Sequence, residues 1–188
     1  MLAGVGFGQG PVSVAPLLMA RAGAVLATGG KLIEPYLVQA LRLSAGETAV
    51  GGREAVWRSR VSPPGREQAI PSSIALQLNR RLRDVFESPK GTAAGLGKLW
   101  FKEGEWQVAK ASRGKGWERV PLAGKTGTAW RTARAGIDDS WVVAWAPAEK
   151  ARVVTCVLVE GAGTGAAVAG PIAVELLKQS LETLRAQP

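Results

Sequence analysis

Three apolar segments in the second half of the chain constrain its fold more than any other feature. Residues 120–130, 140–145 and 152–159 are rich in the β-branched and aromatic side chains that favour strands. The short turn 147–150 joins the last two segments, so we expect an antiparallel meander. From Pro171, leucines recur at helical spacing and predict a C-terminal helix. Its predicted buried face comprises Ile172, Leu176, Leu177, Leu181 and Leu184.

Two further helices are predicted upstream of the meander. Residues 13–27 are apolar nearly all round and are followed by Thr28-Gly29-Gly30, so we expect a helix that is buried on most sides. Pro71-Ser72-Ser73 opens a second helix, which Pro89 ends. Its predicted apolar stripe comprises Ile74, Leu78, Leu82 and Val85. Helices followed by a meander and a last helix indicate an α+β fold.

The remaining segments are less regular. Residues 31–71 read as irregular chain with short strands at 36–43 and 55–60. The basic, tryptophan-rich segment 98–118 contains two short apolar runs around residues 102–105, which predicts a hairpin. Aromatic and basic side chains together can stack on sugars or bases, but we favour tryptophans that pack on the domain. Core packing is also the expectation for Trp130, Trp141 and Trp145.

The charge balance leaves two interpretations open. The chain has 24 Lys and Arg against 15 Asp and Glu, which gives a net charge of +9 over 188 residues. This excess is compatible with an anionic partner, or with a solvated basic surface, which we favour. No zinc-finger spacing, leucine-zipper repeat or RNA-binding signature is present, so the sequence does not favour nucleic acid as a partner.

Histidine and cysteine usage excludes several kinds of site. The chain has no histidine and only one cysteine, Cys156, so it cannot build an intramolecular disulfide, a His/Cys zinc site or a Ser-His-Asp triad. Cys156 lies within the strand-like run 153–159, and we expect an inert core thiol. No metal ligand set is predicted.

The apolar N-terminal stretch does not have the pattern of a targeting segment. Residues 1–27 carry no basic residue before Arg21, and Pro11 and Pro16 interrupt them. A signal peptide needs its positive charge first, and a membrane span needs a longer unbroken run. We therefore expect neither an export signal nor an anchor here, and the sequence alone predicts no compartment.

Gly124-Lys125-Thr126-Gly127-Thr128 is the segment that carries chemistry. On a strand, Thr126 and Thr128 would lie on one face, because side chains alternate. Gly127 would let a ligand's backbone approach closely. A cation, two hydroxyls and an unpaired strand edge suit a peptide that ends in a carboxylate. Lys-Thr-Gly is also one of the signatures of penicillin-binding proteins and serine β-lactamases.

Five segments in order resemble the penicillin-binding transpeptidases. The similar segments are Gly8-Gln9-Gly10 with Val14-Ala15-Pro16-Leu17, the helix end 24–31, the segment 88–93 that ends in the turn Gly91-Thr92-Ala93, the strand 140–147 and Pro171-Ile172-Ala173. They surround the Lys-Thr-Gly-Thr motif over nearly the whole chain. The Gly-Gln-Gly opening is more similar to the monofunctional class B type than to the bifunctional type. The resemblance implies the transpeptidase and serine β-lactamase-like fold.

The resemblance also implies roles for the motif. Lys125 would take the cationic place beside the nucleophilic serine. Thr126, Gly127 and Thr128 would bind the terminal carboxylate of a D-alanyl-D-alanine stem peptide, or of a β-lactam that mimics it. The backbone N–H of Thr128 would form half of an oxyanion hole. The family uses no metal or organic cofactor, and the parent protein would act in the cell envelope, at the periplasmic face of the inner membrane.

The chain departs from the family pattern where the nucleophile is concerned. Acylation needs a serine in Ser-x-x-Lys, and the family's second motif is Ser-x-Asn. The chain has no Ser-x-Asn, and its one Ser-x-x-Lys runs from Ser112 to Lys115 in a glycine-rich basic loop, where we take it as coincidence. We therefore expect residues 1–188 to form a single, partial transpeptidase domain, with 98–118 as an inserted segment, that is inactive alone.

Two other functions remain as alternatives. One is a fragment of a serine β-lactamase or β-lactam sensor, since both share Lys-Thr-Gly. The other is a non-catalytic domain that binds wall peptide or a partner chain. In the family's sheet the last strand also pairs with a strand from the N-terminal part. We therefore expect residues 152–159 to leave an open edge through which the chain associates with itself or with an upstream partner.

Overall fold

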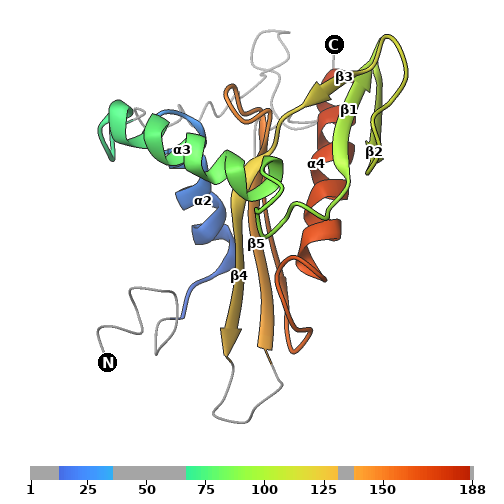
Figure 1. The fold of residues 1–188 in the computed structure, drawn as a ribbon. Helices are drawn as coiled ribbons and strands as arrows, with labels where there is room; N and C mark the ends of the chain where they lie inside the picture. Colours follow the sequence, from blue (N-terminus) through green and yellow to red (C-terminus); the bar gives the residue numbers. More distant parts are fainter. Residues whose placement is uncertain (1–12, 36–66, 131–137, 187–188) are drawn as a thin grey trace, which may run out of the picture.

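A computed structural model of the chain describes residues 13–35, 67–130 and 138–186. The described residues form three helices and two three-stranded antiparallel sheets (Figure 1). This arrangement confirms the predicted α+β class. The strands expected at 36–43 and 55–60, and the Gly-Gln-Gly segment, lie outside the described residues.

The larger sheet is the predicted meander. It consists of β4 (Ala123–Trp130), β5 (Asp138–Ala146) and β6 (Val153–Val159), in the order β4-β5-β6. β5 pairs antiparallel with both neighbours. The first strand was expected to begin at Val120, but that residue ends a separate strand. Pro121 explains the break, because proline has no N–H to donate to a ladder.

The smaller sheet is built from the tryptophan-rich segment. It consists of β1 (Lys98–Lys102), β2 (Glu105–Ala109) and β3 (Glu118–Val120), in the order β2-β1-β3. β1 and β2 form the predicted hairpin, and Glu103 and Gly104 make its turn with φ of 46° and 106°. Trp100 and Trp106 are each only 9% exposed, so they pack on the domain as expected.

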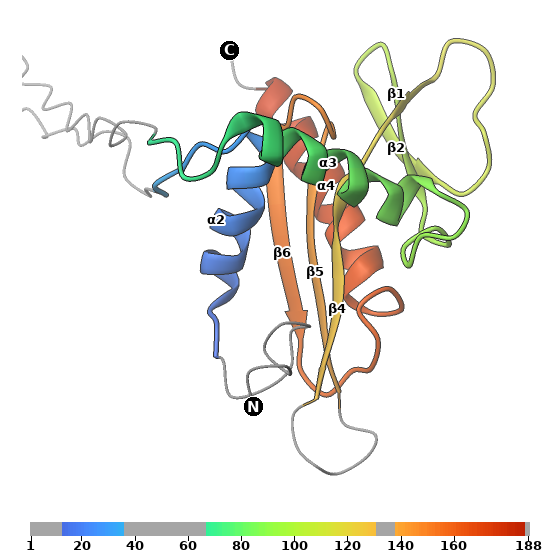
Figure 2. The ribbon, with the colours of Figure 1, turned by 60° about the vertical axis from the view of Figure 1, so that its left-hand side comes forward.

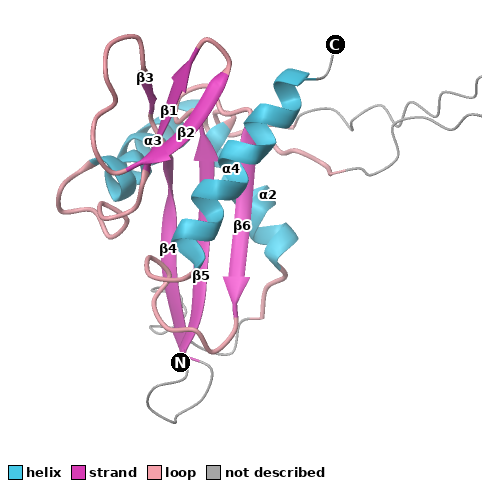
Figure 3. Ribbon diagram, turned by 90° about the vertical axis from the view of Figure 1, so that its right-hand side faces the viewer, coloured by secondary structure: helices cyan, strands magenta, loops and turns pink. Residues whose placement is uncertain are grey.

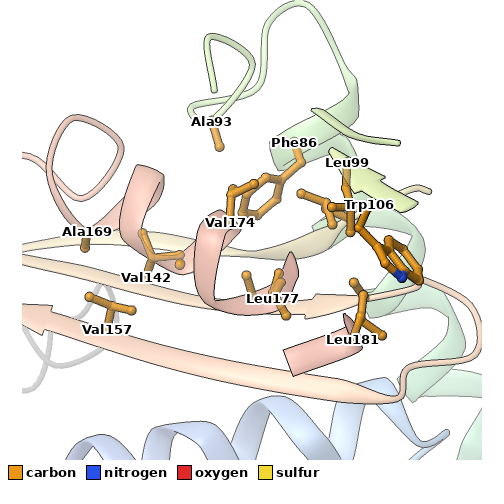
Figure 4. Close-up of a cluster of buried hydrophobic side chains, with 14 residues drawn as sticks. Phe86, Ala93, Leu99, Trp106, Val142, Val157, Ala169, Val174, Leu177 and Leu181 are labelled. Atoms are coloured by element: carbon orange, nitrogen blue, oxygen red, sulfur yellow. The ribbon is translucent and has the colours of Figure 1, made fainter. Parts of the chain in front are cut away.

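Helices cover both faces of the larger sheet. α4 (Ala169–Ala186) lies on one face and α2 (Pro16–Ala27) on the other (Figures 2 and 3). Residues of β5 alternate between two cores, as strand geometry requires. Val142 joins the core beneath α4 with Leu177 (Figure 4), and Ala144 belongs to the same core. Val143 and Trp145 join the core beneath α2.

The predicted helix faces need correction. α2 is not buried on most sides: Leu17 and Leu18 are 58% and 51% exposed, because the described chain covers only the face of α2 that packs on the sheet. In α4, Leu177 and Leu181 are buried as predicted. The other predicted core residues of α4, Ile172, Leu176 and Leu184, are exposed, and Ala173 and Val174 are buried instead.

α3 (Ser72–Glu87) turns inward a face that matches the predicted stripe only in part: Leu82 and Val85 pack against the two cores, but the other two members do not. Ile74 and Leu78 are 49% and 43% exposed. The buried positions are Ala75, Asn79 and Phe86, one residue out of phase with the predicted stripe. Small Ala75 permits close packing, and Asn79 bonds to the sheet: Trp145 Nε1 donates to its Oδ1 at 2.9 Å and its Nδ2 donates to Ala148 O at 2.7 Å.

Two smaller expectations can also be compared with the structure. Cys156 is partly buried, and burial raises the pKa of its thiol, so little thiolate forms near neutral pH. Within the described ranges, no helix combines the length and the apolar character required to cross a bilayer.

Candidate functional site

The Lys-Thr-Gly-Thr motif lies in the middle of β4, an edge strand of the larger sheet. In the part of the chain that the structure describes, β4 has one strand partner, β5. α3 crosses near the start of β4, and the rest of the strand extends away from it (Figure 1). β4 therefore presents an edge on the side away from β5, where an extended peptide can add to a sheet.

The strand register places the motif side chains on two faces. Lys125 and Gly127 lie opposite Val143 and Trp141, on the face covered by α2. Thr126 and Thr128 lie opposite Val142 and Ser140, on the face covered by α4. The two threonines thus share a face, as the alternation predicted.

The environments of Lys125 and Thr126 differ greatly. Lys125 is exposed, and its Nζ donates a hydrogen bond to the carbonyl of Thr126. Thr126 is only 7% exposed, and its Oγ1 lies 2.7 Å from Thr92 Oγ1. Sequence alternation identified the face of Thr126 but not its burial, because the turn that covers it comes from a distant part of the chain.

Thr128 contacts the loop between β6 and α4. Gly165 N donates to Thr128 Oγ1 at 3.4 Å. The cross-strand neighbour of Thr128, Ser140, is fully buried and anchors the same loop. Ser140 Oγ donates to Thr164 O at 2.9 Å and accepts from Ala169 N at 3.0 Å.

Three glycines allow the backbone to pack closely around the motif. A Cβ on Gly124 would lie 2.2 Å from Val143 O, and one on Gly127 would lie 3.2 Å from Trp141 Cβ. A Cβ on Gly165 would lie 2.5 Å from Gly127 O. The site therefore depends on glycine at Gly124 and Gly165, with a weaker demand at Gly127.

The aromatic side chains near the site separate into two groups. Trp145 is 1% exposed and Trp141 is partly buried, as expected for packing residues. Trp130 is 71% exposed, so the expectation of core packing is wrong for it. Trp130 is the last residue of β4 and lies opposite Asp138, the first residue of β5.

The Ser-x-x-Lys tetrapeptide does not resemble a nucleophile. Ser112 and Lys115 are exposed in the loop before β3, and Ser112 Oγ donates to the neighbouring Arg113 O at 3.2 Å. No helix begins there. Three residues near the motif had no predicted role, namely Thr92, Ser140 and Gly165. Thr92 and Ser140 lie in segments that the sequence had marked, the Gly91-Thr92-Ala93 turn and the strand 140–147, whereas Gly165 does not.

The family can now be assigned. The sequence model of the penicillin binding protein transpeptidase domain matches residues 2–178. The chain belongs to this family. The family predicted from the Lys-Thr-Gly-Thr motif and its neighbouring segments is therefore confirmed, and the fold and relatives are class B-like.

Similar proteins are much longer than this chain. It is 28% identical over 174 residues to the peptidoglycan D,D-transpeptidase PbpA of Mycolicibacterium smegmatis, which covers 88% of this chain and 29% of that protein. It is 26% identical over 179 residues to the peptidoglycan D,D-transpeptidase MrdA of Haemophilus influenzae, which covers 92% of this chain and 24% of that protein. The chain thus spans less than a third of these relatives.

Solved structures show the same relationship. The imipenem acyl-enzyme complex of penicillin-binding protein A from Mycobacterium tuberculosis superimposes with a TM-score of 0.64 at 26% identity, over 96% of this chain and 34% of that one. The penicillin G acyl-enzyme complex of the same protein gives a TM-score of 0.63 at 25% identity, over 96% and 35%.

Proposed function

We propose that this chain provides the C-terminal part of a peptidoglycan D,D-transpeptidase domain, the part that binds the carboxylate end of the ligand. The observation that carries the proposal is the edge strand β4, on which an exposed lysine adjoins two threonines that share one face. The ligand would be a stem peptide ending in D-alanyl-D-alanine, or a β-lactam. β-Lactam acyl-enzymes of a similar protein support the same assignment.

Each motif residue has a role that its position supports. Lys125 supplies the exposed positive charge next to the strand edge. Thr126 and Thr128 supply hydroxyl donors, which suit an acceptor-only carboxylate. The Thr128 backbone N–H would supply half of an oxyanion hole, a contribution worth about 3–4 kcal/mol in acyl transfer. Gly127 has no side chain, so the ligand backbone could approach the strand closely at this position.

The acyl transfer itself would need a serine in Ser-x-x-Lys, a tetrapeptide that occurs once in the sequence. Ser112, in the only Ser-x-x-Lys, is in an exposed loop away from any helix start. β4 would position the ligand and stabilise the oxyanion, but it would not supply the nucleophile that attacks the ligand. The proposed role of this chain is therefore recognition, with the covalent step dependent on a nucleophile from outside it.

Carboxylate recognition can be tested on the chain itself by NMR titration. The probe is an acetylated L-lysyl-D-alanyl-D-alanine peptide, and its C-terminal amide serves as the control ligand. We expect binding of the acid to shift the amide signals of Lys125 to Thr128, with little effect of the amide peptide. Thr128→Val should weaken binding of the acid by about 1–3 kcal/mol.

A matched control separates this effect from general disturbance. Thr183→Val removes the same hydroxyl from an exposed position on α4, where Thr183 Oγ1 donates to the Gln179 carbonyl at 2.9 Å. It should leave affinity unchanged. Equal binding of acid and amide, or no effect of Thr128→Val, would refute carboxylate recognition by this strand.

A further inference from the structure

The loop 110–117, which joins β2 to β3, is rich in cations and contains no acidic residue. We refer to it as the basic loop; its three cations, all exposed, are Lys110, Arg113 and Lys115. Figure 2 shows the loop projecting from the smaller sheet on the side of the molecule away from α2. A fourth cation lies against the loop, since a Cβ on Gly116 would lie 3.3 Å from Lys102 Cε and 3.6 Å from Lys102 Nζ. The basic loop and Lys102 therefore bring four positive charges to this part of the surface.

The other cations of the tryptophan-rich segment have partners in the fold. Lys98 Nζ donates to the carbonyl of Phe86, and Arg119 forms an ion pair with Glu87. By contrast, none of the four cations at the basic loop forms an ion pair within residues 13–35, 67–130 and 138–186. The fold does not use these four charges for its own pairing, so their donors remain available to a ligand.

Acidic residues flank the basic loop and limit its net charge. Glu103 and Glu118 lie just outside it in the sequence, and Glu105 lies opposite Lys102 in the β1–β2 ladder. The Glu105 carboxylate accepts a hydrogen bond from Gln107 Nε2. The long-range attraction of this surface for anions is therefore small. Recognition has to come from charge-assisted hydrogen bonds that individual cations of the loop donate.

The contacts of the basic loop hold its cations in place. The Arg113 guanidinium carbon lies 5.6 Å from the centre of the Trp117 ring, so the two side chains stack. Trp117 N donates to Gly114 O at 3.3 Å, and Gly116 adopts a φ of 89°, which glycine favours. A stacked guanidinium still donates in its own plane, and its fixed position lowers the entropy cost of binding.

Trp117 adds an aromatic surface beside these cations. Its side chain is partly exposed, unlike those of Trp100 and Trp106, which are each 9% exposed. An aromatic ring offers apolar area on which a sugar ring can pack, and the adjoining guanidinium pairs with a carboxylate. The two features together suit a polymer that carries both sugars and carboxylates.

We propose that the basic loop, with Lys102, is an accessory binding surface for an uncross-linked peptidoglycan strand. This inference rests on the proposed function, since stem peptides that end in D-alanyl-D-alanine give such a strand carboxylates at repeated intervals. The cations of the loop would bind carboxylates of the strand away from the stem peptide that occupies β4. The inserted segment would thus favour a polymeric ligand over a free stem peptide.

The test measures how tightly the 188-residue chain binds fluorescently labelled, soluble, uncross-linked peptidoglycan strands. The same strands with their carboxylates converted to amides are the control ligand. Arg113→Gln combined with Lys115→Gln should weaken binding of the acidic strands about tenfold, because two charge-assisted bonds are lost. Arg80→Gln combined with Arg81→Gln removes the same charge from exposed positions on α3 and should stay within about twofold of the original chain.

Two results would refute the inference. Equal binding by the two double variants would show that the basic loop is not the site. Equal binding of acidic and amidated strands by the original chain would show that carboxylates are not what it recognises.

The tripeptide titration of β4 in the original chain separates the two proposals. Selectivity for the acid tripeptide, together with either of those results, would leave the proposed function standing without the accessory surface. Loop-dependent binding of acidic strands without selectivity for the acid tripeptide would refute carboxylate recognition by β4 and support the basic loop as an anion-binding surface.

Discussion

Replacing Gly165 by alanine should distort β4, because the added Cβ would press on the backbone of β4 and β5. Gly165 lies in the loop between β6 and α4, and its ideal Cβ would lie 2.4 Å from Trp141 O, 2.5 Å from Gly127 O and 2.9 Å from Gly127 N. All three atoms belong to the backbone of paired strands, so none can move without straining the β4–β5 ladder. The shortest distance is about 1 Å below ordinary van der Waals contact.

The size of the effect depends on whether the loop can retreat. Ser140 holds the loop at Thr164 O and at Ala169 N, with bonds of 2.9 and 3.0 Å. Moving the loop away from β4 would break the hydrogen bonds to this fully buried hydroxyl. We therefore expect Gly165→Ala to lower the free energy of unfolding by about 2–3 kcal/mol, the upper part of the range for overpacking. For a chain of this length that corresponds to a decrease in Tm of about 4–12 °C.

Urea denaturation and NMR of the same variant check this expectation. Gly95→Ala is the matched control, since an added Cβ would meet no other described segment within 4 Å and its φ lies outside the left-handed region, so it should stay within about 0.5 kcal/mol of the original chain. The amide signals of Gly127 and Thr128 should shift in Gly165→Ala alone. Equal stability of the two variants, with unshifted motif signals, would show that the loop does not press on the strand.

Three further predictions concern the core, the chemistry and the sheet edge. Asn79→Leu should lower the free energy of unfolding by about 2–4 kcal/mol, because Trp145 Nε1 and Ala148 O lose their buried partner. Gln77→Leu, at an exposed position of the same helix, is the control. An unchanged urea midpoint for Asn79→Leu would contradict this prediction. The isolated chain should not be labelled by a fluorescent penicillin, and a labelled band at its mass on a denaturing gel would disprove this. The chain should also self-associate through β6, which has one strand partner among the described residues and no internal charge. Light scattering tests this, and a monomer with strong amide protection along β6 would count against it.

The order of elements could be predicted from the sequence, but the faces of the helices could not. The meander and the hairpin follow from local composition and turns, which act over a few residues. The inward face of α3 depends instead on what the sheet offers it. Trp145 Nε1 and Ala148 O need a polar partner, and Asn79 supplies both bonds, so α3 turns Asn79 inward and leaves Leu78 at 43% exposure. A prediction from the spacing of apolar residues does not take into account that buried polar groups need hydrogen-bond partners.

The same limit applies to the candidate site. Alternation along β4 placed Thr126 and Thr128 on one face, which needs only the period of a strand. It could not say what covers that face. Two backbone contacts decide this, one at Gly91 against the end of α3 and one at Gly165 against β4, and each brings a distant segment onto a threonine of the motif. A glycine in a sequence indicates that the backbone approaches something closely, but only the fold shows that these two contacts bring distant segments onto Thr126 and Thr128, the residues proposed to bind the ligand.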